Sequence, residues 1–250
     1  MLAITRKNMI REQLREHKTI QIAEMADMLR VTRETIRRDL RSMEDDGELI
    51  RTHGGAYIID GVHNDLDLST RQYLLTAEKE TIAQKCQDLI QNGDYIFLDA
   101  STTAWFIAKA SMNRKITVLT TSLEIMNLLS TSQSVKLFAI GGEYSPSTKS
   151  FYGNGANRYL EQYYVDKCFI SCRSVSMEAG LTDTNDDDSL LHRLAISHST
   201  KRYLAIDNSK LNRTSFSYIA PVHVLDGIIL DCPFPEDWII YLKGNNVSWY

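Results

Sequence analysis

The stretch from Thr32 to Leu40, which reads TRETIRRDL, constrains the fold more than any other part of this chain. Ile36, Leu40 and Met43 recur at the three- and four-residue spacing of a buried helical stripe. The opposite side carries arginines. Thr32 is positioned as an N-cap, because its hydroxyl can accept from the free amides of the first turn. The sequence therefore predicts a short helix with one apolar side and one basic side.

Two further helices are predicted upstream. The first has the positions Arg6, Ile10 and Leu14, spaced four apart. The second is a short apolar helix that contains Ile22, Met25, Met28 and Leu29. Three helices within residues 6 to 43 form a helix-turn-helix arrangement, in which the last helix enters the major groove of DNA.

These helices belong to a longer ordered pattern. It comprises Arg6 through Leu14, then Thr32, Thr35, Ile36, Arg37, Arg38, Asp39 and Leu40, followed by Asp46-Gly47, Leu49-Ile50-Arg51 and His53-Gly54-Gly55-Ala56. The pattern resembles the N-terminal signature of the DeoR family of bacterial transcriptional regulators. The resemblance implies a winged helix-turn-helix domain over residues 1–58. Its hairpin wing would carry Arg51 and His53 near the tip, and Gly54-Gly55 would permit a backbone turn.

The basic helix face and the wing are the expected DNA contacts. They comprise Thr32, Arg33, Glu34, Thr35, Arg37, Arg38, Arg41, Arg51 and His53. The overall charge gives little support for DNA binding, because residues 1 to 57 hold 11 Lys and Arg against 10 Asp and Glu, and the rest of the chain holds 17 against 22. The alternative is a merely solvated helix face. The placement of the arginines on the one face that a groove would meet favours DNA binding.

One position departs from the family. Where members usually have a glycine at the end of the second helix, this chain has Arg30. A left-handed C-cap would cost about 1 kcal/mol more there than with glycine. Either the turn has another shape or Arg30 contacts a phosphate.

Length and composition predict a second domain. A chain of 250 residues greatly exceeds a winged helix, and its formal charge of −4 lies on the larger remainder, which favours a small-molecule or protein partner there. The cysteines lack the spacing of a zinc site or a disulfide framework and are interpreted as reduced core residues of a cytoplasmic protein. They are Cys86, Cys168, Cys172 and Cys232. No membrane segment, signal peptide, metal or cofactor is expected.

The sequence pattern changes after the predicted wing. From Asp60 to Ser69 the sequence has neither helical nor strand period, so residues 59–75 are predicted as a linker. An amphipathic helix follows from Ala77 to Ile90. Short apolar runs then alternate with helical stretches, which predicts an α/β domain over residues 76–250 with a doubly wound, mainly parallel sheet. The runs are Tyr95–Leu98, Ile116–Leu119, Val135–Ile140, Cys168–Ser171, Tyr203–Ile206 and Gly227–Leu230.

Small and polar residues follow these predicted strands. Asp99-Ala-Ser-Thr-Thr103 and Thr120-Thr-Ser122 each lead into a helix, whose free amides and positive dipole end can bind an anion. Gly141-Gly142 would permit close backbone approach, and Lys210 follows a fourth strand. The alternative for each turn is simple N-capping. Together they predict a ligand crevice at the carboxyl ends of the strands.

The order of these turns resembles the sugar-phosphate-binding domain of the same family, which is similar in fold to ribose-5-phosphate isomerase. The resemblance implies that Ser101, Thr102 and Thr103 hold a phosphate, and that Asp99, Gly141 and Lys210 border the sugar. Thr121, Ser122 and Gly142 complete the expected effector site.

Several other positions depart from the family or carry weaker motifs. Arg173 replaces part of a glycine-containing segment and would add a phosphate contact or narrow the pocket. The run Asp183 to Asp188 replaces a segment in which members often carry a glutamate and a lysine near the ligand, and is interpreted as an acidic helix N-terminus. His192 and His198 are interpreted as surface residues, and Gly153 to Arg158 as a loop.

The sequence thus predicts a repressor that binds double-stranded operator DNA and responds to a phosphorylated sugar. Paired half-sites imply a homodimer or homotetramer. One alternative is a phosphosugar isomerase-like enzyme, in which Asp99 or Asp166 would act as general base. Another is a ligand-independent architectural DNA binder.

Overall fold

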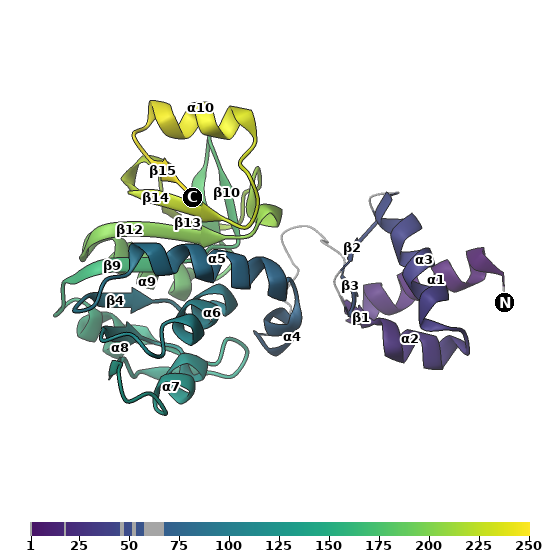
Figure 1. The fold of residues 1–250 in the computed structure, drawn as a ribbon, viewed down its shortest axis with the longest axis horizontal. Helices are drawn as coiled ribbons and strands as arrows, with labels where there is room; N and C mark the ends of the chain where they lie inside the picture. Colours follow the sequence, from purple (N-terminus) through teal and green to yellow (C-terminus); the bar gives the residue numbers. More distant parts are fainter. Residues whose placement is uncertain (1, 18, 46–47, 52–53, 58–67) are drawn as a thin grey trace. The chain divides into compact units, whose positions relative to one another are not determined.

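The computed structural model describes residues 2–17, 19–45, 48–51, 54–57 and 68–250, and the chain divides into two compact units, Met1–Leu75 and Thr76–Tyr250. The first unit contains helices α1 (Ala3–His17), α2 (Ile22–Leu29), α3 (Arg33–Asp45) and α4 (Leu68–Tyr73) (Figure 1). Its antiparallel sheet has the order β1-β3-β2, from β1 (Thr19–Gln21), β2 (Ile50–Arg51) and β3 (Gly55–Tyr57). Helix α4 lies in the segment predicted as a linker, so that prediction was wrong for residues 68–73.

The predicted apolar stripes form the core of the helix-turn-helix. Ile10, Ile36, Leu40 and Met43 are completely buried. Met28 is the exception, because its side chain is 53% exposed. The stripe of α2 runs through its buried neighbours at positions 22, 25, 26 and 29, so position 28 falls at the solvent edge of the helix.

A buried ion pair joins the first helix to the third. The Arg6 guanidinium donates to both carboxylate oxygens of Asp39, with Nε to Oδ2 at 2.6 Å and Nη2 to Oδ1 at 3.0 Å. Both residues are less than a tenth exposed. Such two-point pairing adds geometric specificity to charge attraction, so it fixes the orientation of α3 relative to α1.

The wing contains an additional strand that the sequence did not reveal. Strand β1 pairs with β3, and Ile20 lies opposite Ala56. A Cβ atom on Gly55 would lie 1.9 Å from the carbonyl oxygen of Ile20, so only glycine fits. Gly55 therefore serves the pairing of β1 with β3. The tip of the wing, including His53, lies outside the described residues.

Arg30 adopts the left-handed conformation, with φ 52° and ψ 47°. Its backbone amide donates to the Asp27 carbonyl, and the next amide, of Val31, donates to the Ala26 carbonyl. The turn after α2 therefore keeps the shape that glycine favours, although the residue there carries a side chain.

Replacing Arg30 with glycine should stabilise the N-terminal unit. Relief of left-handed strain is worth about 1 kcal/mol, which raises the melting temperature of a small domain by roughly 4–8 °C. Arg30→Ala is the matched control, since it removes the guanidinium but keeps Cβ and the strain. Thermal unfolding of the three full-length proteins makes the comparison. A melting temperature for Arg30→Gly no higher than that of Arg30→Ala would contradict the strain.

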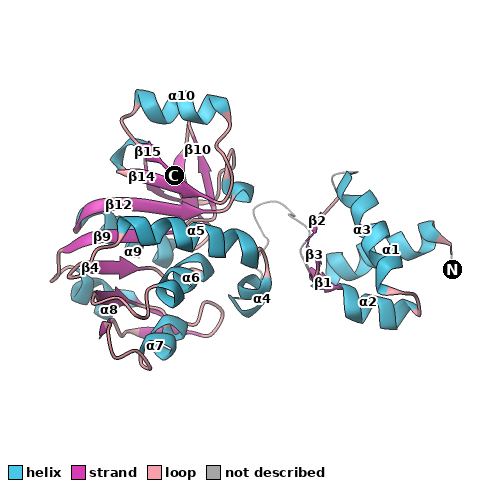
Figure 2. Cartoon of the chain, in the orientation of Figure 1, coloured by secondary structure: helices cyan, strands magenta, loops and turns pink. Residues whose placement is uncertain are grey.

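The second unit is built on a seven-stranded, fully parallel sheet of order β15-β14-β12-β9-β4-β5-β6 (Figure 2). Its strands are β4 (Tyr95–Leu98), β5 (Thr117–Thr120), β6 (Lys136–Ala139), β9 (Val165–Ile170), β12 (Ser199–Ile206), β14 (Gly227–Leu230) and β15 (Ser248–Trp249). The helices are α5 (Thr76–Leu89), α6 (Thr102–Ala110), α7 (Leu123–Leu129), α8 (Gly153–Leu160), α9 (Asp186–Ser197) and α10 (Glu236–Gly244).

Helices cover both faces of this sheet. Ile96 and Leu98 pack with buried residues of α5, α6 and α7, whereas Phe97 packs with those of α8, α9 and α10. Successive residues of β4 therefore point to opposite cores, as the period of a strand requires. The predicted doubly wound α/β architecture is confirmed.

Smaller elements complete the unit. A hairpin of β7 (Glu143–Ser145) and β8 (Ser150–Tyr152) follows β6. An antiparallel sheet has the order β10-β11-β13, from β10 (Ser174–Ser176), β11 (Gly180–Asp183) and β13 (Ser217–Ala220). The predicted loop from Gly153 to Arg158 is in fact part of helix α8, whose Ala156 and Leu160 are buried at four-residue spacing. Packing of this stripe outweighs the low helix propensity of two glycines.

Candidate functional site

Helix α3 separates its two faces as the sequence predicted. Its buried residues are Ile36, Asp39, Leu40 and Met43, and its exposed residues include Arg33, Glu34, Arg37, Arg38 and Arg41. The Thr32 hydroxyl accepts from the Thr35 amide at 3.2 Å, which confirms the predicted N-cap. Arg37 pairs with Glu34 at 3.2 Å, but exposed pairs of this kind contribute little. Within the described residues, Arg38 has no ion-pair partner and its guanidinium faces solvent.

Arg51 forms an ion pair with Glu44 of the first unit. Its Nε donates to Glu44 Oε2 at 2.6 Å, and its backbone amide donates to Glu44 Oε1 at 2.9 Å. Burial opposes ionisation of Glu44, but the hydrogen bonds and charge of Arg51 outweigh it and lower the pKa of that carboxyl. Arg51 thus ties the wing strand β2 to α3. A DNA contact by Arg51 stays a prediction, and it would compete with this pair.

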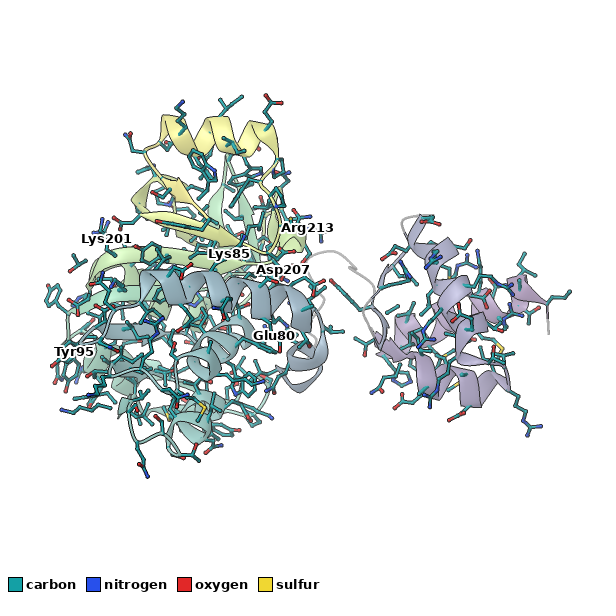
Figure 3. All side chains as sticks on the ribbon, in the orientation of Figure 1. Glu80, Lys85, Tyr95, Lys201, Asp207 and Arg213 are labelled. Carbon is teal, nitrogen blue, oxygen red and sulfur yellow. The ribbon has the colours of Figure 1, made fainter. Side chains whose placement is uncertain are left out.

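In the second unit, most of the predicted effector residues follow the carboxyl ends of the parallel strands. Figure 3 shows the two ends of the sheet: Tyr95 begins β4 and Lys201 lies in the first half of β12, whereas Asp207 directly follows the carboxyl end of β12. The chain builds β5 and β6 on one side of β4, then crosses to place β9 and β12 on the other side. Open α/β sheets bind ligands at such a switch point, outside the carboxyl ends of the strands.

Asp99 occupies this switch point. Its carboxylate is 2% exposed, and Oδ1 accepts from the Ser101 amide at 3.0 Å. Oδ2 accepts from the Ser171 amide at 2.6 Å and meets Nε2 of His192 at 3.1 Å. One carboxylate therefore joins the end of β4, the end of β9 and helix α9.

The first turn of α6 has hydrogen-bond donors without partners in the described residues. The Ser101 hydroxyl accepts from the Ala104 amide at 3.0 Å and so caps the helix. Thr102 and Thr103 are the first two residues of the helix, and their amides precede the first intrahelical bond. Among the described residues, neither threonine hydroxyl has a hydrogen-bond partner. Two amides, two hydroxyls and the positive end of the helix dipole suit a small anion.

The second predicted anion turn is satisfied within the protein. The Ser122 hydroxyl accepts from the Ile125 amide at 3.3 Å, and the Ser122 amide donates to Thr120 Oγ1 at 3.1 Å. The Leu123 amide donates to the Lys149 carbonyl. Thr121 and Ser122 are each 1% exposed. The structure thus supports capping at this turn, and it leaves only the turn after β4 open to an anion.

The two glycines after β6 differ in their surroundings. A Cβ on Gly142 would lie 2.3 Å from the carbonyl oxygen of Tyr152, so this glycine is required by the packing of the β7–β8 hairpin. A Cβ on Gly141 would meet nothing within 4 Å. Gly141 is exposed at the carboxyl end of β6 and leaves room beside the site.

Lys210 lies beyond the end of β12, in a short 3-10 helix (Asn208–Lys210). Its Nζ is 3.9 Å from Asp207 Oδ2. Burial opposes the charge of Asp207, but Lys210, the Ser209 hydrogen bonds and Lys79 outweigh it and lower the pKa of Asp207. Lys210 thus lies at the carboxyl end of the sheet, as predicted, and its ammonium group lies near the carboxylate of Asp207.

The sequence interpretation of His192 as a surface residue was wrong. The side chain is 5% exposed and lies against Asp99. One turn earlier on α9, Asp188 accepts a 2.7 Å hydrogen bond from the Tyr152 hydroxyl. Burial is the main reason that the pKa of Asp188 rises to about 6. The signal was present in the sequence, because positions 189, 192, 195 and 196 share the buried stripe of α9.

The other departures have structural roles. The acidic run begins α9 as predicted, with Asn185 as the N-cap and three aspartates in the first turn. Asp183 Oδ2 accepts from the Arg173 amide at 3.0 Å, so this backbone contact ties the segment after β9 to β11. Asp166 precedes the middle of β9 and accepts from the Tyr95 amide at 2.8 Å, which places it at the opposite edge of the sheet. Asp166 is therefore excluded as a general base at this site.

Other chemistries find no support in the described ranges. No group of three or more His, Cys, Asp or Glu side chains there is arranged to hold a metal ion. Cys86, Cys168 and Cys172 are buried and unpaired, and burial raises the pKa of the Cys168 thiol to about 11. A search of the same residues finds no helix with the length and apolarity that a bilayer crossing requires.

Comparison with known proteins matches both units. Residues 6–62 match the DeoR-like helix-turn-helix domain, and residues 75–232 match the DeoR C terminal sensor domain. The chain belongs to the DeoR family. A DeoR-family protein is a DNA-binding transcription regulator.

Relatives match over nearly the whole chain. The uncharacterized HTH-type transcriptional regulator YulB of Bacillus subtilis is 36% identical over 99% of this chain and 96% of its own length. The putative aga operon transcriptional repressor of Escherichia coli O157:H7 is 30% identical over 97% and 91%. The HTH-type transcriptional repressor GlcR of Bacillus subtilis is 33% identical over 87% and 84%.

One solved structure with a related fold is ribose 5 phosphate isomerase A from Neisseria gonorrhoeae. It is 17% identical, with a TM-score of 0.40, and the match covers 53% of this chain and 52% of that chain.

The raised pKa of Asp188 gives a testable dependence of stability on pH. An ordinary aspartate titrates near 3.9 in the unfolded chain, so between about pH 4 and pH 6 the folded protein binds more protons and loses stability as the pH rises. Asp188→Asn removes this loss and still accepts from Tyr152. At pH 7.5 the variant should therefore be more stable than the parent by about 1–3 kcal/mol.

Thermal unfolding of the full-length proteins at pH 5 and pH 7.5 checks this expectation. Asp187→Asn is the matched control, because Asp187 is an exposed neighbour in the same helical turn. Equal pH dependence in all three proteins would show that Asp188 ionises normally.

Proposed function

We propose that this protein represses a sugar-metabolism operon, and that a phosphorylated sugar bound at the carboxyl edge of the sensor sheet changes its affinity for double-stranded operator DNA. The observation that carries the proposal is the turn after β4. There the open donors of Thr102 and Thr103 lie three and four residues after the buried Asp99, at the switch point of the sheet. A phosphate fits the donors, and the neighbouring polar groups suit sugar hydroxyls.

The regulatory mechanism would be linkage. A phosphosugar that binds one arrangement of the protein better than another shifts operator affinity by no more than the difference between those two binding free energies. A single winged helix reads few base pairs. A homodimer or homotetramer on paired half-sites is therefore part of the proposal, and so is a cytoplasmic location, where the operator is.

The DNA contacts are proposed from the exposed face of α3 and its cap. The residues are Thr32, Arg33, Glu34, Thr35, Arg37, Arg38 and Arg41, with Arg51 and His53 on the wing. Arg33, Arg38 and Arg41 are the strongest of them, since they are exposed and no carboxylate of the described residues forms an ion pair with them; Arg38 is chosen for the test. The buried face with Ile36 and Leu40 keeps the helix in place.

An isomerase-like activity has weaker support. Asp166 lies at the amino end of the sheet, away from the proposed ligand site. Asp99 already accepts hydrogen bonds from two amides and contacts His192. A general base needs a lone pair directed at the substrate. The relatives compared above are described as transcriptional regulators.

The DNA half of the proposal predicts a loss in Arg38→Ala. Operator binding should weaken by about 1–3 kcal/mol if a base edge is contacted, or uniformly with a salt slope lower by about one if only a phosphate is contacted. The melting temperature should change little, because Arg38 is exposed. Titration of labelled operator at several salt concentrations measures this, and a reporter gene should be derepressed.

Lys136→Ala is the control, since it removes an exposed cation from the sensor sheet. Equal operator affinity of Arg38→Ala and the parent at every salt concentration would remove Arg38 from the interface. Lower reporter transcription in cells lacking the parent protein would make it an activator.

The sensor half predicts that Thr102→Asp abolishes the phosphosugar response while operator binding survives. A carboxylate in the first turn repels an incoming phosphate and occupies its donors. Because Thr102 is 7% exposed, Thr102→Asn serves as an uncharged control of the same size. Its response should be reduced but present. Release from operator DNA is measured with increasing phosphosugar, with the unphosphorylated sugar in parallel.

Release of the operator by Thr102→Asp at the parent's phosphosugar concentration would move the phosphate site elsewhere. An equal response of the parent to the unphosphorylated sugar would show that no phosphate is sensed.

A further inference from the structure

His192 has one ring nitrogen that the protein leaves unused. The ring is 5% exposed, and its Nε2 contacts Asp99 Oδ2 at 3.1 Å. Its Nδ1 is buried and has no hydrogen-bond partner within the described part of the chain. In the sensor unit, no other side-chain nitrogen or oxygen of the described residues is in this condition. Leaving a buried polar atom unpaired destabilises a protein, so this nitrogen calls for a partner from outside the chain.

The charges around the ring are acidic. Asp99 faces it from the end of β4, Asp183 from β11, and Asp188 from one turn earlier on α9. Tyr152, at the end of β8, donates to Asp188. Burial opposes protonation of His192, but Asp99, Asp188 and Asp183 outweigh it and raise the pKa of the imidazole. These carboxylates would repel a phosphate at Nδ1, whereas a neutral polar group meets no such repulsion.

We propose that Nδ1 of His192 forms a hydrogen bond with a hydroxyl of the sugar part of the effector, so that His192 selects the sugar while the turn at Thr102 and Thr103 holds the phosphate. The proposal rests on the proposed function. A hydroxyl fits because it can both donate and accept. With Nε2–H donating to Asp99, a neutral ring presents Nδ1 as an acceptor, and a protonated ring presents it as a donor. A sugar hydroxyl satisfies either form.

The two subsites share one anchor. The carboxylate of Asp99 binds the Ser101 amide through Oδ1 and the His192 ring through Oδ2. The phosphate turn and the imidazole are therefore positioned by the same group. Asp99 acts as a positioning residue for both.

A pair of amide variants tests the role of Nδ1. In His192→Gln the side-chain amide reaches the position of Nε2, so it keeps the contact with Asp99 and loses Nδ1. In His192→Asn the amide takes the position of Nδ1 and loses the contact with Asp99. Calorimetric titration of the full-length proteins uses glucose 6-phosphate, galactose 6-phosphate, N-acetylgalactosamine 6-phosphate, fructose 6-phosphate and ribose 5-phosphate. Inorganic phosphate is titrated as a competitor that needs only the phosphate turn.

The expected result is that His192→Gln weakens the best phosphosugar of the parent about tenfold or more, because one buried hydrogen bond is lost and a polar subsite is left unpaired. Competition by inorganic phosphate should stay within twofold of the parent. His192→Asn should bind that phosphosugar more tightly than His192→Gln. Melting temperatures of all proteins monitor the fold.

The outcomes separate this proposal from the proposed function. Phosphosugar affinity of His192→Gln within twofold of the parent, with Thr102→Asp unable to bind, overturns the role of His192 and leaves the phosphate site standing. Absence of binding by the parent to every phosphosugar overturns both. Equal weakening of phosphosugar and inorganic phosphate in His192→Gln also overturns the proposal, since it would reveal a general disturbance of Asp99 in place of a sugar contact.

Discussion

A single buried carboxylate organises the sensor unit. Removing a charge from water is costly unless it is paired and hydrogen-bonded, and Asp99 meets this cost with two backbone amides and an imidazole. Those donors belong to the turn after β4, the end of β9 and helix α9. At this switch point β4 and β9 pair directly, with Leu98 opposite Phe169. Asp99 extends this link beyond the paired strands, because its carboxylate joins the turn that begins α6 to the segment after β9.

The DNA-reading unit uses the same kind of interaction for another purpose. Asp39 lies among arginines in the sequence, yet its partner is Arg6 of the first helix, across a buried interface. The exposed arginines of α3 are thereby left without that carboxylate. The apolar stripe and the ion pair together fix the rotation of α3, which decides which side chains a groove can meet.

The sequence allowed the parallel sheet to be predicted because its strands are short continuous apolar runs, which only a strand buried on both faces requires. It did not predict β1, the β7–β8 hairpin or the β10-β11-β13 sheet, since these short strands are not continuous apolar runs. The phosphate turn was predicted from its hydroxyl residues, but sequence alone could not distinguish the open turn at Thr102 from the satisfied one at Ser122. Hydrogen bonds that the amides of Ser122 and Leu123 donate to Thr120 Oγ1 and the Lys149 carbonyl decide that difference.

Asp39 and His192 illustrate one rule, although only His192 was assigned to the surface from the sequence. Each is a polar residue at a position that helical spacing assigns to the buried stripe, beside Ile36 and Met43 in one helix and beside Ala195 and Ile196 in the other. Reading polar residues as exposed loses this information, whereas reading the stripe first predicts that each needs a buried partner. Asp39 finds its partner within the protein. His192 finds one for Nε2 only, and within the described residues the rule that explains the fixed recognition helix leaves Nδ1 without a hydrogen-bond partner.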